Sequence, residues 1–153
     1  MIEREAITNL ILETFRLNGR LLAAGDTIVS DIGLTSARWQ VLGAIGLSPA
    51  PLPVAHIARN MGLTRQAVQR LVNEMERGGL VRFAANPHHQ RAKLVLLTAQ
   101  GKAAYDTAMT RQEPWARSLA EGIGTQRIEA ATATLRTIRR RLDNSFSQEV
   151  SDD

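Results

Sequence analysis

The chain has 153 residues, of which 44% are hydrophobic, so it is long enough for one domain with a buried core. It carries a formal net charge of +4 and no cysteine, which excludes a disulfide scaffold, a cysteine–zinc site and thiol-based redox sensing. It has no apolar run of about 18 residues and no secretion signal at its start, so we expect a cytoplasmic protein.

The N-terminal part is expected to be helical. Apolar residues recur at helical spacing from about residue 3 towards residue 31, and Gly33 is expected to end this first helix. Thr35 is placed to cap a second helix that carries Trp39.

Two short helical patterns joined by a glycine turn follow. Pro53 suits the first turn of a helix, and Asn60-Met61-Gly62 predicts where that helix ends, because glycine adopts the left-handed conformation easily. Thr64 then caps a further helix that runs to about Arg77. This order predicts a helix-turn-helix.

The last of these helices has two different faces. Its apolar residues predict one buried stripe: Val68, Leu71, Val72 and Met75. The cap and the opposite face carry side chains that can bond bases or phosphates: Thr64, Arg65, Gln66, Gln69, Arg70, Asn73 and Arg77. These residues predict a DNA-reading helix, and an ordinary solvated helix face is the alternative.

A basic hairpin is expected after Gly78-Gly79, with strands at 80–83 and 92–97 and a turn at Asn86-Pro87. The loop and its exit supply hydrogen-bond donors and no acidic residue, as suits a loop that approaches DNA: His88, His89, Gln90, Arg91 and Lys93. Residues 59–93 hold seven basic and two acidic side chains, a net charge of +5, while the rest of the chain has −1. Attraction to a polyphosphate requires such a distribution, although patches of charge also arise by chance.

The neighbouring His88 and His89 permit two interpretations. A metal site would need more ligands, and the chain offers only His56 as a further imidazole and no cysteine. A DNA contact that depends on pH is favoured, because histidine titrates near neutrality. No metal or other cofactor is expected.

The C-terminal part is again predicted to be helical. Thr98 caps one helix, which meets Pro114 and ends near residues 121–124, and Thr125 opens the last helix. The three terminal helices have more apolar surface than one small domain can bury. This surplus indicates a second copy of the chain as partner. The alternative is that they complete a monomeric core. Residues 146–153 are expected to form a disordered tail.

Several segments together resemble the multiple-antibiotic-resistance regulator (MarR) family of bacterial transcription factors. They are Leu34-Thr35-Ser36-Ala37-Arg38-Trp39-Gln40-Val41-Leu42, Gly79-Leu80-Val81 and residues 91–101. The family's wing usually has an acidic residue two positions before the arginine that matches Arg91, where it steadies that arginine. This chain has His89 there, so the usual ion-pair partner of Arg91 is missing. The absence of cysteine excludes the oxidant-sensing branch of the family.

The resemblance implies a single mainly α domain over 1–153, with a winged helix-turn-helix at 34–98 and dimerisation helices at 1–33 and 99–145. It implies a homodimer that binds palindromic double-stranded DNA and acts as a ligand-responsive repressor. A small aromatic or anionic effector would bind between the dimer helices and the winged module, with Trp39, Arg16 and His56 as candidate contacts.

Two other functions are alternatives to DNA binding. The chain lacks a phosphate-binding glycine loop and a nucleophile motif, so no enzymatic activity is expected. A winged helix can also serve as a protein-interaction module without specific DNA binding. That function predicts an apolar patch where the helix 64–77 instead presents Gln66, Arg70 and Asn73.

Overall fold

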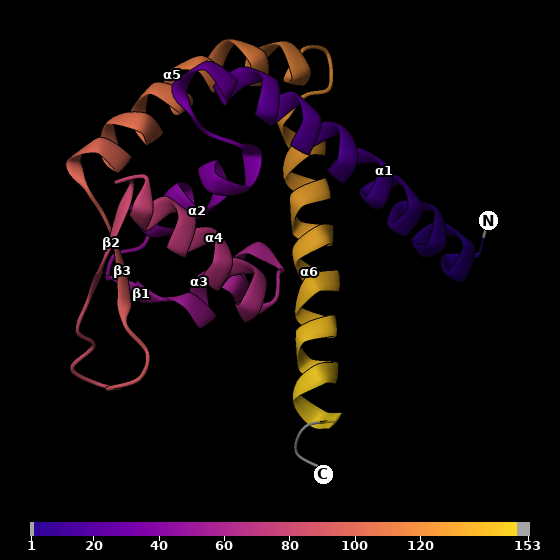
Figure 1. Ribbon diagram of the computed structural model, residues 1–153. Helices are drawn as coiled ribbons and strands as arrows, with labels where there is room; N and C mark the ends of the chain where they lie inside the picture. Colours follow the sequence, from indigo (N-terminus) through magenta and orange to yellow (C-terminus); the bar gives the residue numbers. More distant parts are fainter. Residues whose placement is uncertain (1, 150–153) are drawn as a thin grey trace. The chain divides into compact units, whose positions relative to one another are not determined.

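The computed structural model describes residues 2–149 and is mainly helical, with a small antiparallel sheet (Figure 1). The elements are α1 (Glu3–Val29), a 3₁₀ turn η1 (Ser30–Ile32), α2 (Ser36–Gly46), β1 (Leu52–Pro53), α3 (Val54–Met61), α4 (Arg65–Arg77), β2 (Val81–Ala84), β3 (Leu94–Leu97), α5 (Ala99–Ala120) and α6 (Thr125–Glu149). The chain divides into two compact units, Met1–Gln112 and Glu113–Asp153. In the described part of the chain, no helix combines the length and the apolar character needed to cross a membrane.

The first unit confirms the predicted helix ends. Gly33 has φ 74° after η1, and the Thr35 hydroxyl accepts a hydrogen bond from the Arg38 amide at 3.2 Å at the start of α2. Gly62 has φ 66° at the end of α3, and the Thr64 hydroxyl accepts a bond from the Ala67 amide at 3.1 Å. The turn and both caps follow from local chemistry alone, which explains why the sequence predicted them.

Pro53 is the exception, because it does not lie within the first turn of α3. It precedes the helix with φ −75° and ψ 160°, and with Leu52 it forms β1, which pairs with Val95 and Leu94 of β3. A two-residue strand is too short to show an alternating pattern, so the sequence did not predict it. The sheet order is β1-β3-β2.

Strands β2 and β3 form the predicted hairpin, with Val81 opposite Leu97 and Ala84 opposite Leu94. Strand β2 is displaced by one residue from the expected 80–83. Strand β3 is two residues shorter than expected, because residues 92 and 93 belong to the loop. The Asn86 carboxamide oxygen accepts a bond from the His88 amide at 3.0 Å, which confirms the turn at Asn86-Pro87. The loop between the strands extends away from the helices of this unit (Figure 1).

The core of the first unit gathers the apolar faces of α2, α3, α4 and the hairpin. Three of the four residues in the predicted stripe of α4 are fully buried, namely Val68, Val72 and Met75, and Leu71 is half-buried. Each fully buried side chain of this size stabilises the fold by about 1.5–3 kcal/mol. The stripe therefore fixes α4 with its polar face towards solvent.

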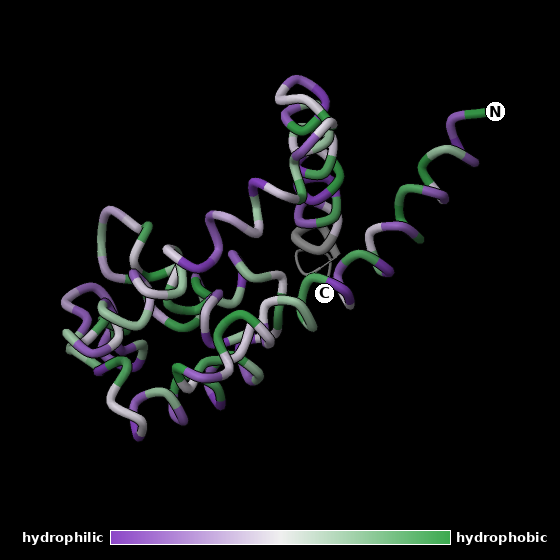
Figure 2. The backbone as a smooth tube through the Cα atoms, turned by 90° about the horizontal axis from the view of Figure 1, so that it is seen from above, coloured by the Kyte–Doolittle hydropathy of each residue, from purple (hydrophilic) through white to green (hydrophobic). Residues whose placement is uncertain are grey.

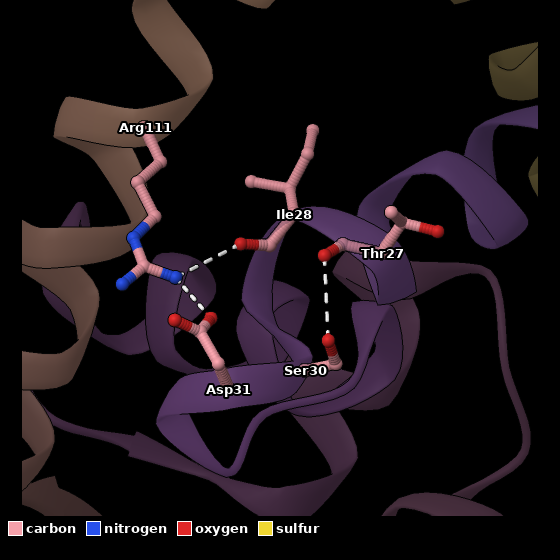
Figure 3. A network of polar contacts seen from close by, with 5 residues as sticks. All are labelled: Thr27, Ile28, Ser30, Asp31 and Arg111. Atoms are coloured by element: carbon pink, nitrogen blue, oxygen red, sulfur yellow. Dashed lines mark hydrogen bonds and ion pairs between the residues drawn. The ribbon is translucent and has the colours of Figure 1, made fainter.

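An ion pair joins α5 to η1, the 3₁₀ turn that follows α1, within the first unit (Figure 3). The Arg111 guanidinium donates to the Asp31 carboxylate and, at 3.2 Å, to the Ile28 carbonyl oxygen. The hydrogen bond from Arg111 lowers the pKa of Asp31 below its ordinary value. The pair therefore adds stability at neutral pH that is lost as the pH falls through the lowered pKa, and its exposure to solvent keeps that contribution small.

The second unit contains the end of α5 and all of α6. Helix α5 runs through Pro114 to Ala120, and Gly122 and Gly124 have φ 76° and 93° in the loop that follows. Helix α6 continues to Glu149, so the expectation of disorder is wrong for residues 146–149. No glycine or proline interrupts 125–149, so nothing local ends the helix at 145. The expectation for residues 150–153 lies outside the described residues.

Candidate nucleic-acid interface

Residues 65–73 of α4 present a polar surface on one face of the helix. Five of its predicted site residues line one shallow hollow of about 410 Å³: Arg65, Gln66, Gln69, Arg70 and Asn73. All are exposed except Asn73, which is half-buried, and the capping Thr64 is exposed beside them. Arg77 lies at the far end of the helix and does not line this hollow.

A second groove, of about 440 Å³, joins α4 to the hairpin loop. It is lined by Val54, Ala55, Arg65, Gln69, Asn73, Phe83, Arg91, Ala92 and Lys93. The structure thus brings together residues from α4 and from the loop that the sequence analysis had singled out separately. Three cationic side chains, Arg65, Arg91 and Lys93, converge on this groove, which gives it the charge that a phosphate backbone requires.

The apolar part of this groove was not predicted from the sequence. Phe83 lies on the same face of β2 as buried Val81 and directly opposite Val95 of β3, and it is half-buried at the groove beside Val54 and Ala55 of α3. A single phenylalanine in a four-residue strand carries no signal that distinguishes a groove residue from a core residue.

Two amides on α4 are paired before any ligand binds. The Gln69 side-chain nitrogen donates to the Asn73 side-chain oxygen at 2.9 Å, one helical turn away. This bond holds both side chains in one orientation at the junction of the hollow and the groove, because Gln69 and Asn73 line both. The pairing reduces the rotamer freedom that these side chains would lose on contact with DNA.

The tip of the hairpin loop is exposed. His88, His89 and Arg91 are all accessible to solvent, and neither histidine lines the groove. His56 is exposed on α3. Within residues 2–149, no three histidine, cysteine, aspartate or glutamate side chains are grouped so that they could hold a metal ion.

One ion pair, which the sequence analysis did not predict, joins α4 to α2. An Arg38 guanidinium nitrogen lies 3.6 Å from a Glu74 carboxylate oxygen, and 32% of the Arg38 side chain and 41% of the Glu74 side chain are exposed. Because the partners are 36 positions apart, helix periodicity offered no signal for this contact.

The three candidate effector contacts lie on three different helices. Trp39 of α2 is partly buried and packs against the hydrophobic core. Arg16 is exposed on α1 and pairs with Glu13 at 2.5 Å, and His56 is exposed on α3. None of them lines the two cavities described above.

Comparison with known proteins agrees with this geometry. Residues 32–92 match the sequence profile of the MarR family. An uncharacterised protein of Mycobacterium tuberculosis is 32% identical over 132 residues, which cover 86% of this chain and 91% of that protein. The transcriptional activatory protein BadR of Rhodopseudomonas palustris is 28% identical over 92% of this chain and 80% of its own length.

Two similar solved structures were determined with bound molecules. The transcriptional regulator MosR of M. tuberculosis in complex with DNA has a TM-score of 0.72 and 27% identity, over 86% of this chain and 96% of that chain. CouR of Rhodococcus jostii bound to p-coumaroyl-CoA has a TM-score of 0.73 and 27% identity, over 81% of this chain and 87% of that chain.

Proposed function

The chain belongs to the MarR family and is a DNA-binding transcriptional regulator, and from this premise we propose that it acts as a homodimeric, ligand-responsive repressor on a palindromic operator. The main support for DNA binding is the groove shared by α4 and the hairpin loop, which is lined by Arg65, Arg91 and Lys93. A helix that enters the major groove beside a loop that reaches the backbone or minor groove would use both sides of this cavity.

Within this interface the residues divide into two kinds of contact. Gln66 and Arg70, at the centre of the exposed face of α4, are assigned to base edges, with Gln69 and Asn73 beside them. Phosphates are assigned to Thr64 and Arg65 at the start of the helix and to the hairpin-loop residues His88, His89, Arg91 and Lys93. MosR, which has a similar fold and was solved with DNA, supports DNA binding by this chain.

The proposed dimer is supported by apolar side chains that neither unit covers. Phe15 of α1 is 72% exposed, and Leu142 of α6 is 56% exposed. Figure 2 shows hydrophobic residues recurring along the described length of α1. A second copy would bury these faces and would place two reading helices on one two-fold site.

The proposed effector is a small aromatic or anionic molecule, for which the ligand-bound CouR is the supporting relative. Trp39, Arg16 and His56 remain the candidate contacts. An effector changes operator binding only if its affinity differs between the DNA-bound and DNA-free forms. An effector that releases the repressor must bind the DNA-free form more tightly, so its addition should weaken operator binding. A reporter gene under the operator decides between repression and the activation that BadR's name describes, because deletion of the regulator raises expression only in the first case.

Replacing Arg70 by alanine tests the reading role. We expect the variant to lose about 1–3 kcal/mol of discrimination at one base position in each half-site, because a bidentate contact to a base is lost. Competition binding against duplexes changed at single positions measures this effect. Arg20→Ala, which removes an exposed arginine of α1, controls for the loss of one positive charge. An Arg70→Ala protein that prefers the operator as strongly as the wild type would contradict the base-reading role.

Salt dependence distinguishes DNA reading from a protein-interaction module. A regulator that neutralises several phosphates loses affinity steeply as salt rises, whereas a protein-interaction module would show only weak binding to any duplex. Gel shifts with operator and random duplexes at two salt concentrations make the comparison.

The two histidines of the loop are proposed to donate to DNA phosphates, because both are exposed at its tip. The variant His88→Ala/His89→Ala should weaken binding to operator and random duplexes by the same factor, because a phosphate contact carries no sequence information. Gel shifts with both duplexes measure the change. Unchanged affinity for both duplexes would place both imidazoles away from the DNA.

A further inference from the structure

Glu74 lies on α4 among arginines of the proposed reading face. It follows Arg70 by four positions and precedes Arg77 by three, and residues at these spacings are neighbours on a helix surface. Either arginine could therefore pair with Glu74. Within residues 2–149, however, neither arginine is engaged in an ion pair, and Glu74 lies 3.6 Å from Arg38 of α2 instead.

The backbone of Arg38 is held in place. Its backbone amide bonds the Thr35 hydroxyl at 3.2 Å in the first turn of α2, and α2 buries Val41 and Leu42 in the core. Its guanidinium therefore approaches Glu74 from a fixed neighbouring helix. About a third of the Arg38 side chain is exposed, so water screens the pair less than it would a pair of fully exposed side chains.

Without Arg38 as its partner, Glu74 would compete with a DNA base for the guanidinium of Arg70. A carboxylate one helical turn from an arginine attracts it, and the guanidinium nitrogens that bond a carboxylate are the same ones that would bond a guanine edge. Arg70 would then have to leave Glu74 before it could read a base. The carboxylate would also bring negative charge towards the DNA phosphates.

We infer that Arg38 is a specificity-determining positioning residue, which holds Glu74 away from Arg70 and so keeps Arg70 available to read a base. Arg38 acts through Glu74 and need not contact the DNA. This inference rests on the proposed reading role of Arg70.

Arg38→Gln tests it with little loss of packing, since glutamine keeps part of the side-chain stem. We expect the ratio of operator to random-duplex affinity to fall about two- to five-fold, as the loss of one partly exposed pair allows. The preference should relax at the same base position that Arg70→Ala relaxes. Arg38→Lys should keep the wild-type ratio, and Arg20→Gln controls for the lost charge.

A double-mutant cycle with Glu74→Gln completes the test. Glu74→Gln alone should keep the wild-type ratio, because Arg70 then has no carboxylate beside it. The double variant Arg38→Gln/Glu74→Gln should recover the wild-type ratio. Thermal unfolding of each variant checks that it is folded. If Arg38→Gln fails to fold, Arg38→Lys and Glu74→Gln still test the inference. A changed ratio of operator to random-duplex affinity in either variant would overturn it.

Two results would overturn the inference while leaving the proposed function intact. Equal weakening of operator and random duplexes by Arg38→Gln, without recovery in the double variant, would make Arg38 a phosphate contact. An unchanged ratio in Arg38→Gln would show that Glu74 does not reach Arg70. Failure of the proposed function itself would appear separately, as an unchanged base preference in Arg70→Ala.

Discussion

Replacing Gly101 by alanine is expected to lower the free energy of unfolding by about 3 kcal/mol or more. A Cβ atom at Gly101 would lie 2.0 Å from the Leu80 carbonyl oxygen and 3.0 Å from the Leu80 carbonyl carbon. Both are backbone atoms at the start of the hairpin, so no side-chain rotation relieves the clash. Urea unfolding followed by circular dichroism measures the loss.

The neighbouring hydrogen bonds prevent an easy shift of the backbone. The Thr98 hydroxyl accepts a bond from the Gly101 amide at 3.0 Å and donates to the Gly79 carbonyl oxygen at 2.6 Å. These bonds connect the first turn of α5 to Gly79, which lies just after the end of α4. Moving α5 away from Leu80 would stretch them and would disturb the strands that support the loop.

Gly19→Ala is the matched control. Gly19 is also within a helix, but nothing lies within 4 Å of a Cβ added there. Alanine should leave the stability unchanged or raise it by about 0.5–1 kcal/mol, because glycine is the poorer helix former. If Gly101→Ala were as stable as Gly19→Ala, the close approach of α5 to Leu80 would be wrong.

Ending the chain at Gly124, which removes α6, is expected to abolish the proposed dimer and lower operator affinity by about 10²–10⁴-fold. The second half-site contact then loses the effective concentration that the dimer provides. Analytical ultracentrifugation measures the oligomeric state, and gel shifts measure the affinity. A wild-type protein that sediments as a monomer at micromolar concentration would contradict the dimer.

Single substitutions on α6 refine this result without removing the helix. Leu135 is 42% exposed and Leu142 is 56% exposed, and because they are seven positions apart they form an apolar stripe on one face of α6. The variant Leu135→Asp/Leu142→Asp should dissociate the dimer, because it places charge in an apolar interface. Thr137→Asp, on the opposite side of the helix, should leave the dimer intact. Equal dissociation by both variants would show that the stripe is not the interface.

Local chemistry explains which parts of the fold were predictable. The threonine caps at positions 35 and 64, the left-handed glycines at 33 and 62, and the turn after Asn86 each depend on a few neighbouring residues. The buried stripe of α4 depends on helical periodicity alone. Where no local signal exists, prediction failed, as at β1 and at the expected end of α6 at residue 145.

Periodicity and charge are properties of short segments, so the amino-acid sequence alone predicts that α4 has one apolar and one polar face and that a basic loop follows it. Tertiary packing brings Arg65 of α4 together with Arg91 and Lys93 of the loop in one groove, with Phe83 beside them. It also places Glu74 next to Arg38 of α2, with which it pairs instead of with the arginines on its own helix. Such contacts join residues far apart in the chain, so they depend on how the buried faces pack.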